Sequence, residues 1–290
     1  YYGEVDTKWG QDIGGKLGAD GINLQTKNVY MSVNLPDTGL ALDLGVMGTS
    51  VGFDGFLINH DAAGLNAKTG DLTVMYRKFD EGASTSADDV DFYAAVYGLG
   101  DISLMAAYVD DNSGGFQAKD DYQVLGAEYK GKAGDIGINA WFMYQMGTED
   151  ADSPAEIDVS AYAMTVQAVM GPAAVRFLYT SGDDDATDSD NNEFQYDIGG
   201  GYYFYNENLM IFYTDKYYMN LGSTEVDKAG NGLMAITAKY DTMVGDYYLK
   251  LGAGYFLSSE DVGTEDELGY EIAARMGKKF AEKVDISANA

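Results

Sequence analysis

The sequence holds one histidine, His60, and no cysteine, so few side chains could serve as a catalytic base or nucleophile. Asp61 follows His60, and such a pair can activate a serine when all three side chains are held together. No GxSxG motif or paired serine motif accompanies it. The lack of cysteine also removes thiolate nucleophiles and thiolate metal sites. We therefore predict that the chain is not an enzyme.

A second group of reactive side chains is the run of carboxylates in residues 181–193. Clustered carboxylates suit a hard cation such as calcium. Asp188 and Asp190 begin an EF-hand spacing, but Glu193 stands where glycine is needed and Gly199 stands where glutamate is needed. The pattern favours a solvated acidic loop, with Asp188 and Asp190 as weak calcium candidates. It predicts no firm metal site and no cofactor.

Charge and composition narrow the class of protein further. The formal net charge is -29, and such an acidic chain repels nucleic-acid phosphates, so no nucleic-acid partner is expected. The sequence has 24 Tyr and 37 Gly but only 3 Pro, which is typical of strands joined by tight turns. No stretch reaches the roughly 18 uninterrupted apolar residues of a membrane-spanning helix. We treat residues 1–290 as a single all-β domain.

Apolar and polar residues alternate with the period of a strand in many segments of about ten residues each. In residues 136–146 one face is fully apolar, from Ile136 to Met146, while the other carries Asn139 and Gln145. Similar alternation occurs in residues 40–47, 72–78, 90–97, 102–109, 173–180, 194–203, 234–241, 247–257, 268–280 and from 284 onward. Residues 157–169 are ambiguous. The pattern predicts strands that each have one apolar face.

The connections between these segments alternate between short and long. The short ones have the Gly, Asn, Asp and Pro content of tight turns, and they lie at residues 35–38, 69–71, 98–101, 133–135, 170–172, 206–208, 244–246 and 281–283. The long ones are polar and mostly acidic, and they lie near residues 49–62, 80–89, 110–121, 147–156, 181–193, 215–231 and 258–267. Short turns at one rim and long loops at the other are typical of transmembrane barrels.

Aromatic residues of the apolar faces gather near both ends of the predicted strands, as expected at a membrane–water interface. Near the long-loop end are Tyr76, Tyr108, Tyr144, Tyr179, Tyr213, Tyr255 and Tyr270. Near the short-turn end are Tyr129, Tyr202, Phe204, Tyr240 and Phe280. These positions predict two aromatic girdles.

The patterns together predict an all-β fold, a transmembrane antiparallel up-and-down β-barrel with short periplasmic turns and long acidic extracellular loops. Closure is expected because lipid cannot satisfy the free backbone groups of a sheet edge. The segments give about sixteen strands, and placing both termini in the periplasm would make about eighteen, with both ends of the chain incomplete. A barrel of sixteen strands is the alternative, if one hairpin near residues 49–70 is in fact a loop that folds inward.

In its turn–loop alternation over essentially the whole chain, the sequence resembles Gram-negative outer-membrane porins. The run Asn59-His60-Asp61, with Gly64, residues 69–72 and residues 79–82, is more loosely similar to alginate-export-like porins. Those exporters are associated with a strongly basic pore, and the mixed charges here count against polyuronate export. The resemblance implies an outer-membrane protein surrounded by lipid and lipopolysaccharide, and homotrimers are common for barrels of this size.

If the apolar faces point to lipid, the opposite faces line a lumen. The expected lining residues are Arg77, Asp91, Glu128, Lys130, Asp158, Arg176, Asp197, Lys239, Asp241, Lys250, Glu271 and Arg275, with Asp43, Lys279 and Asp285. Charged rings set an ion preference through the local potential. With acidic loops at the mouth, we expect a water-filled channel for ions and small hydrophilic solutes with a modest cation preference. The alternatives are a substrate-specific polysaccharide or oligosaccharide channel, and a structural or adhesive barrel with a plugged lumen.

Two of the long loops are candidates to fold inward. Residues 52–60 are too apolar to extend into water, so we expect them to enter the pore or to cap a subunit contact. Residues 110–121 contain a flexible bend at Ser113–Phe116, although a plain surface loop is favoured there. The acidic loops could also bind divalent ions that bridge to lipopolysaccharide phosphates or to neighbouring subunits.

Overall fold

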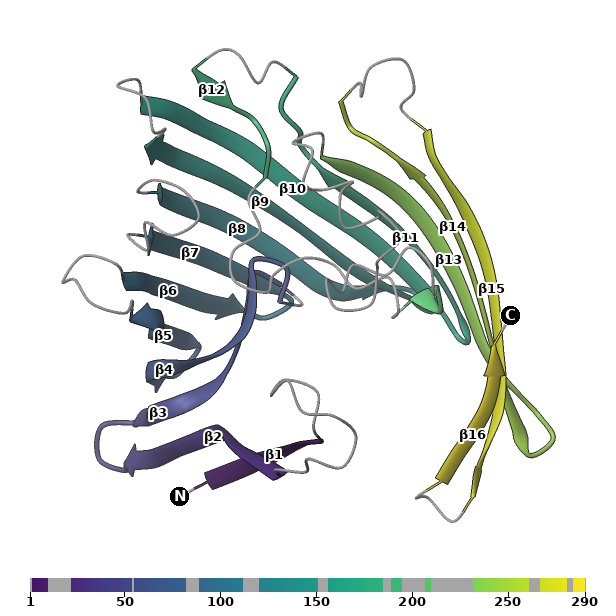
Figure 1. The fold of residues 1–290 in the computed structure, drawn as a ribbon, viewed down its shortest axis with the longest axis horizontal. Coiled ribbons are helices and arrows are strands. Elements are labelled where there is room, and N and C mark those ends of the chain that lie inside the picture. The colour runs from purple at the N-terminus through teal and green to yellow at the C-terminus, as the bar shows by residue number, and fades with distance from the viewer. Residues whose placement is uncertain are drawn as a thin grey trace.

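The structure is a computed structural model, and it describes residues 2–9, 22–53, 55–81, 89–111, 120–150, 156–184, 189–194, 207–209, 232–260, 267–280 and 284–289. These residues form one large antiparallel sheet that curves around an inner space, as the wall of a barrel does (Figure 1). Among them, no helix is long and apolar enough to cross a membrane.

The strands follow one another around the wall in chain order. They are β1 (Tyr2–Trp9), β2 (Ile22–Leu35), β3 (Leu40–Val51), β4 (Ile58–Thr69), β5 (Leu72–Glu81), β6 (Asp89–Leu99), β7 (Ile102–Asp111), β8 (Asp120–Ala133), β9 (Ile136–Asp150), β10 (Glu156–Met170), β11 (Ala173–Thr180), β12 (Asp190–Asn191), β13 (Leu233–Val244), β14 (Tyr247–Leu257), β15 (Glu267–Phe280) and β16 (Val284–Asn289). Each pairs with the next, except that β11 pairs with β13 and the short β12 lies parallel to β10. The predicted up-and-down antiparallel fold is confirmed, and in the described residues the path is open, with β1 and β16 at its ends.

Six of the eight short connections predicted from the sequence are tight turns, after β2, β4, β6, β8, β10 and β13, and the one predicted at residues 281–283 lies outside the described part of the chain. The opposite rim differs from the prediction in detail, because the strands there are longer than the alternation indicated. β9 continues to Asp150 and β10 begins at Glu156, inside a stretch predicted as loop. Of the predicted loop at residues 110–121, the central residues 112–119 lie outside the described part of the chain.

The two faces of the sheet differ in exposure. Along β9, Phe142 is 45% exposed on the outer face, whereas Trp141 and Met143 on the inner face are 3% and 0% exposed. Other large apolar side chains exposed on the outer face include Leu44, Val74, Tyr97, Leu104, Leu125, Val166, Val175, Ile236, Leu251, Ile272 and Ile286. An apolar surface that extends around the wall is unfavourable against water and suits the lipid of a membrane.

The hairpin of β3 and β4 leaves the wall halfway along its length. It pairs with β2 up to Val46 and with β5 up to Ala63. Beyond these residues, the described parts of the two strands pair with each other as far as Val51 and Ile58. The tip curves across the concave side of the sheet toward β8 and β9 (Figure 1). The inward alternative predicted for this apolar loop is therefore confirmed, and much of the predicted loop is strand.

The connection between β11 and β13 leaves and rejoins the wall at the same rim. The backbone N–H of Leu233 donates a 2.8 Å hydrogen bond to Oγ1 of Thr180, so the two ends of the connection lie side by side. Since β11 pairs with β13 along its whole length, no strand from residues 181–232 lies between them. Of the predicted strand at residues 194–203, all residues after Phe194 lie outside the described part of the chain.

Candidate pore lining

Most of the predicted lining residues lie on the inner face, because each alternates in register with buried neighbours of its own strand. They are Arg77, Glu128, Lys130, Arg176, Lys239, Asp241, Lys250, Glu271 and Arg275, together with Asp43 and Lys279. The wall therefore presents charges of both signs to the interior. Their role in conduction stays a prediction.

Asp91 was predicted to line the lumen, but the structure places it on the outer face. It lies in β6 between Val90 and Phe92, which are both buried on the inner face, so its own side chain is on the outer face. There it accepts a 2.7 Å hydrogen bond from the hydroxyl group of Tyr76. The alternation predicted the wrong face for Asp91, because the inner face of β6 is more apolar than its outer face.

Asp158 is the second correction. It is exposed on the outer face of β10, next to Val159, which is buried on the inner face. It lies in the segment whose alternation was ambiguous, because apolar residues occur on both faces of β10. Asp197 lies outside the described residues, and the side chain of Asp285 does as well.

A row of polar side chains crosses the inner face from β8 to β13. The strand register places Lys130 beside Asn139, Asn139 beside Gln167, Gln167 beside Arg176, and Arg176 beside Thr237. The sequence missed Gln167 and Thr237 as lining residues, because only the register shows that they share this row. Hydrogen-bonding groups of this kind can replace the water around a hydrophilic solute.

The row contains a pair of opposite charges at its β8 end. Nζ of Lys130 lies 2.8 Å from Oε1 of Glu128, and the two residues are two positions apart on the same face of the strand. Glu128 is buried while Lys130 is exposed. The carboxylate is therefore held beside a solvated ammonium group.

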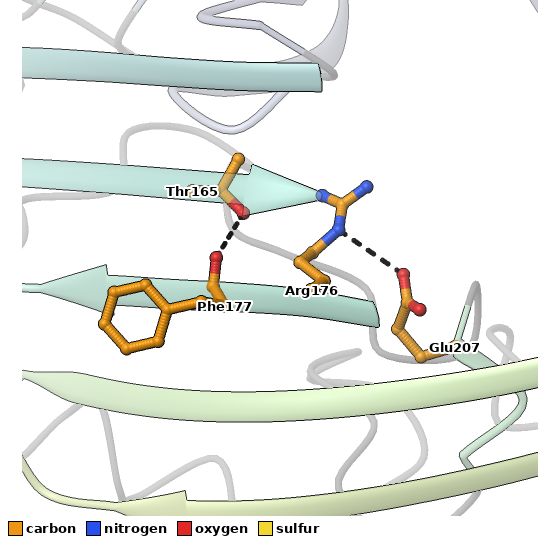
Figure 2. Close-up of polar contacts among 4 residues, drawn as sticks. All are labelled: Thr165, Arg176, Phe177 and Glu207. Carbon is orange, nitrogen blue, oxygen red and sulfur yellow. Dashed lines mark hydrogen bonds and ion pairs between the residues drawn. The ribbon is translucent and has the colours of Figure 1, made fainter. Parts of the chain in front are cut away.

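Arg176 and Glu207 form a buried ion pair in the same row, and their side chains point toward each other in Figure 2. Nε of Arg176 lies 3.5 Å from Oε1 of Glu207, and the two side chains are 7% and 0% exposed. Beside them, Oγ1 of Thr165 donates a 2.6 Å hydrogen bond to the backbone carbonyl group of Phe177 (Figure 2). Burial of two charges is tolerated here because they are paired.

Glu207 also corrects the predicted turn at residues 206–208. A residue in a rim turn would be exposed, whereas Glu207 and Leu209 are fully buried. Nδ2 of Asn208 donates hydrogen bonds to Oδ1 of Asp241 (2.8 Å) and to the carbonyl group of Leu251 (3.0 Å). Residues 207–209 therefore lie against the inner face of β11, β13 and β14.

The inner face is more basic toward the short-turn end of β13 to β15. Register places Asp241 beside Lys250, and Lys250 beside Arg275. The guanidinium group of Arg275 lies 5.8 Å from the centre of the Tyr248 ring, and its Nε donates a 3.3 Å hydrogen bond to Oγ of Ser287. At the rim itself, Nζ of Lys278 donates a hydrogen bond to Oδ2 of Asp246, which lowers the pKa of that carboxyl group.

Arg77 differs from the other lining residues, because it is only 2% exposed and its guanidinium group donates four hydrogen bonds to the β3–β4 hairpin and to its own strand. Nε donates to Oγ1 of Thr49 (2.6 Å) and Nη2 donates to Oδ1 of Asn66 (2.7 Å). Nη1 donates to the carbonyl groups of Leu65 (2.9 Å) and Tyr76 (2.7 Å). These hydrogen bonds make the guanidinium group a structural contact between the hairpin and the wall.

Part of the interior is apolar. Phe56 at the hairpin tip is 4.7 Å from Trp141 and 5.8 Å from Phe194, measured between ring centres. The buried cluster around them reaches from the tip to the opposite wall and includes Phe53, Leu57, Met105, Val124, Met143, Leu178, Leu209 and Phe256. Polar and apolar zones therefore share the inner face of the barrel.

The aromatic girdle is visible on the outer face near the long-loop rim. Register aligns Tyr76 with Tyr93 and Tyr93 with Tyr108, and the rings of neighbouring strands lie 5.2 Å and 6.2 Å apart. Farther along, Tyr162 lies 5.4 Å from Tyr179. Near the other rim, the predicted girdle members exposed on the outer face are Tyr129, Tyr240 and Phe280. Tyr202, Phe204 and Tyr213 lie outside the described residues.

Those possible metal and catalytic residues that the structure describes lie in different parts of the fold. In the described part of the chain, no group of three or more His, Asp or Glu side chains is placed to hold a metal ion. Asp190 lies in β12, paired with Asp158, and Asp188 is outside the described residues. The ring of His60 is bonded through Nδ1 to the backbone oxygen of Asp61 (2.8 Å), so the carboxylate of Asp61 does not orient it.

Comparison with known proteins gives matches among solved structures. No protein-family model matches the chain, and no curated protein matches it. OccK2 (OpdF) of Pseudomonas aeruginosa, solved with glucuronate, is 12% identical with a TM-score of 0.53 over 93% of this chain and 75% of that one. A BenF-like porin from Pseudomonas fluorescens is 13% identical, with a TM-score of 0.55 over 94% and 73%. OccK10 (OpdN) of Pseudomonas aeruginosa is 13% identical, with a TM-score of 0.55 over 99% and 85%.

At these identities the likeness is one of fold. The chain has the fold of Gram-negative outer-membrane β-barrel porins, as its sequence predicted. The apolar outer face of the wall agrees with this fold, because a transmembrane barrel turns such a surface to lipid.

Proposed function

We propose that the protein is a channel through which ions and small hydrophilic solutes cross the outer membrane by passive diffusion. The observation that carries the proposal is the contrast between the two faces of one wall. The outer face is apolar, whereas the inner face holds the polar row from Lys130 to Thr237 and the charged group around Lys250. A lipid-facing exterior around a polar interior is the arrangement of a water-filled pore.

We further propose a modest preference for cations. The lining charges placed on the inner face are of mixed sign with basic groups in excess, so the preference for cations must come from elsewhere in the protein. The negative charge comes from the rims, because the turns expose Asp71, Asp101 and Asp135, and the whole chain carries a net charge of -29. Negative charge at a mouth raises the local concentration of cations.

The test of this proposal is conductance in a planar bilayer under a salt gradient. Stepwise openings whose reversal potential shows cation selectivity would support both parts of it. Anion selectivity would refute the ion preference, and block by one class of sugar would favour the alternative of a substrate-specific saccharide channel.

A specific observation favours a second candidate, a structural barrel with a plugged lumen. The buried apolar cluster around Phe56 and Phe194 crosses the interior, and an apolar constriction can exclude water and ions. A protein that shows heat-modifiable migration and yet conducts nothing would support this candidate.

The outer surface of the barrel also suggests which molecules the protein contacts. The apolar outer face would contact membrane lipid, and the acidic long-loop rim would reach lipopolysaccharide phosphates through divalent ions. Assembly into a homotrimer stays a prediction, which the mass of the detergent-solubilised protein would check.

A further inference from the structure

We infer that Arg77 is a positioning residue, which holds the described tip of the β3–β4 hairpin, residues 51–53 and 55–58, across the interior of the barrel. The effect on conduction rests on the proposed channel function, whereas the position of the tip can be measured without it. This role differs from that of a lining charge, because Arg77 would act through the hairpin and would not touch a solute.

The first step of the argument is the bend of the hairpin. Gly45 of β3 and Gly64 of β4 are register partners at the level where the hairpin separates from the wall. A Cβ atom at Gly45, whose φ is 138°, would collide with the carbonyl oxygen of Val29, and one at Gly64 would collide with that of Tyr76. The neighbouring strands thus pass close to this pair, and only glycine allows the hairpin to turn inward there.

The second step is the position of Arg77 beside that bend. Its four hydrogen bonds join three strands, because Thr49 belongs to β3, Leu65 and Asn66 belong to β4, and Tyr76 belongs to β5. Thr49 lies in the part of β3 that has left the wall, whereas Tyr76 lies in the wall itself. The guanidinium group therefore ties the displaced part of the hairpin to the wall.

The third step is the contact that this tie supports. The tip is closed by backbone hydrogen bonds from Phe56 to Gly52 (3.0 Å) and from Leu57 to Val51 (3.1 Å), so it moves as a unit. Phe56 packs on Trp141 in β9, across the interior from the base of the hairpin. If the base of the hairpin were no longer tied to the wall by Arg77, the tip could withdraw, and the indole ring of Trp141 would become exposed.

Arginine is required for this task, and lysine is not an equivalent. A planar guanidinium group donates in several fixed directions, whereas a lysine ammonium group is a point charge on a flexible stem. A lining charge could be replaced by lysine with little loss. Lysine could not replace an arginine that donates hydrogen bonds to four acceptors on three strands.

Trp141 provides a direct readout, since the chain has only 2 Trp residues. In a Trp9→Phe background, Trp141 fluorescence would be quenched by a water-soluble quencher in proportion to its exposure. We expect weak quenching when Arg77 is present. We expect several-fold stronger quenching and a red-shifted emission in both Arg77→Lys and Arg77→Ala, with the tip released.

The matched control is Lys78→Gln, which removes one positive charge from the adjacent residue on the outer face of the same strand. It should leave the quenching of Trp141 unchanged. Heat-modifiable migration of each variant shows whether the barrel is folded. Phe56→Ala, which removes the ring over Trp141 but keeps the tie, provides an independent route to the same exposure.

Wild-type quenching retained in Arg77→Lys would overturn the inference, and so would strong quenching in the unsubstituted protein. Conductance then tests the consequence: release of the tip should enlarge single-channel conductance in both Arg77 variants. Unchanged conductance with an exposed Trp141 would refute the tip as a constriction. If no variant conducts while the quenching follows the expected pattern, the channel proposal fails and the positioning role of Arg77 stands.

Discussion

Arg176 in β11 and Glu207 in the connection that follows it form an ion pair with 3.5 Å between Nε and Oε1, almost completely removed from solvent. The pair fixes residues 207–209 against the inner face, together with the hydrogen bonds of Asn208. Its position shows that a segment predicted at the rim of the barrel lies inside the wall.

Removal of one partner of this pair should destabilise the barrel. Glu207→Ala leaves the buried guanidinium group without its carboxylate, and the expected loss is about 3–5 kcal/mol in the free energy of unfolding. The double variant Arg176→Met/Glu207→Leu should recover much of that loss, because no buried charge is left uncompensated. Urea unfolding in lipid vesicles measures both, and equal stability of Glu207→Ala and the wild type would contradict the ion pair.

Asn208 combines a side-chain role with a backbone role. Its φ is 63°, which favours glycine or asparagine, and its side chain bonds Asp241 and Leu251. Asn208→Gly keeps the backbone conformation and loses the bonds, for an expected cost of about 1–3 kcal/mol. Asn208→Ala should cost more, because it adds backbone strain, and the reverse order of melting temperatures would exclude this account.

Gly126 gives a second way to move the hairpin tip, from the opposite wall. A Cβ atom on Gly126 would approach Cε2 of Phe53 to 2.8 Å and Cγ of Met143 to 3.1 Å. A larger side chain, as in Gly126→Ile, should therefore displace Phe53 and raise the quenching of Trp141 fluorescence. Gly98→Ala is a suitable control, because its added Cβ atom would meet Asp71 at an ordinary contact distance of 3.7 Å. Equal quenching in the two variants would argue against the contact of the tip with β8.

The outer face should require lipid. Ile272 in β15 is 77% exposed, so Ile272→Lys would place a charge in the hydrocarbon layer if this face is a membrane surface. The expected loss of folding free energy in lipid vesicles is about 2–4 kcal/mol if the residue lies near the bilayer midplane. Asp135→Lys in the exposed turn after β8 should change stability by less than about 0.5 kcal/mol. Similar small effects for both would mean that Ile272 faces water.

Local patterns in the chain were enough to predict most of the strands and their order. Side chains alternate between two faces, and each tight turn after β2, β4, β6, β8, β10 and β13 has its own local chemistry. The same alternation placed residues such as Arg176, Lys250 and Arg275 on the correct face. These features are set by neighbours in the chain, and a single sequence contains them.

What fills the interior became visible only in the tertiary structure, because it depends on contacts between distant segments. Phe92 belongs to the buried cluster that also contains the hairpin tip, so it faces inward and Asp91 faces outward, which the alternation along one strand does not reveal. Glu207 looked like part of a turn because its partner Arg176 is on another strand. Burial of a charge or an aromatic ring is decided by the whole fold, since only packing across the barrel removes water from both partners.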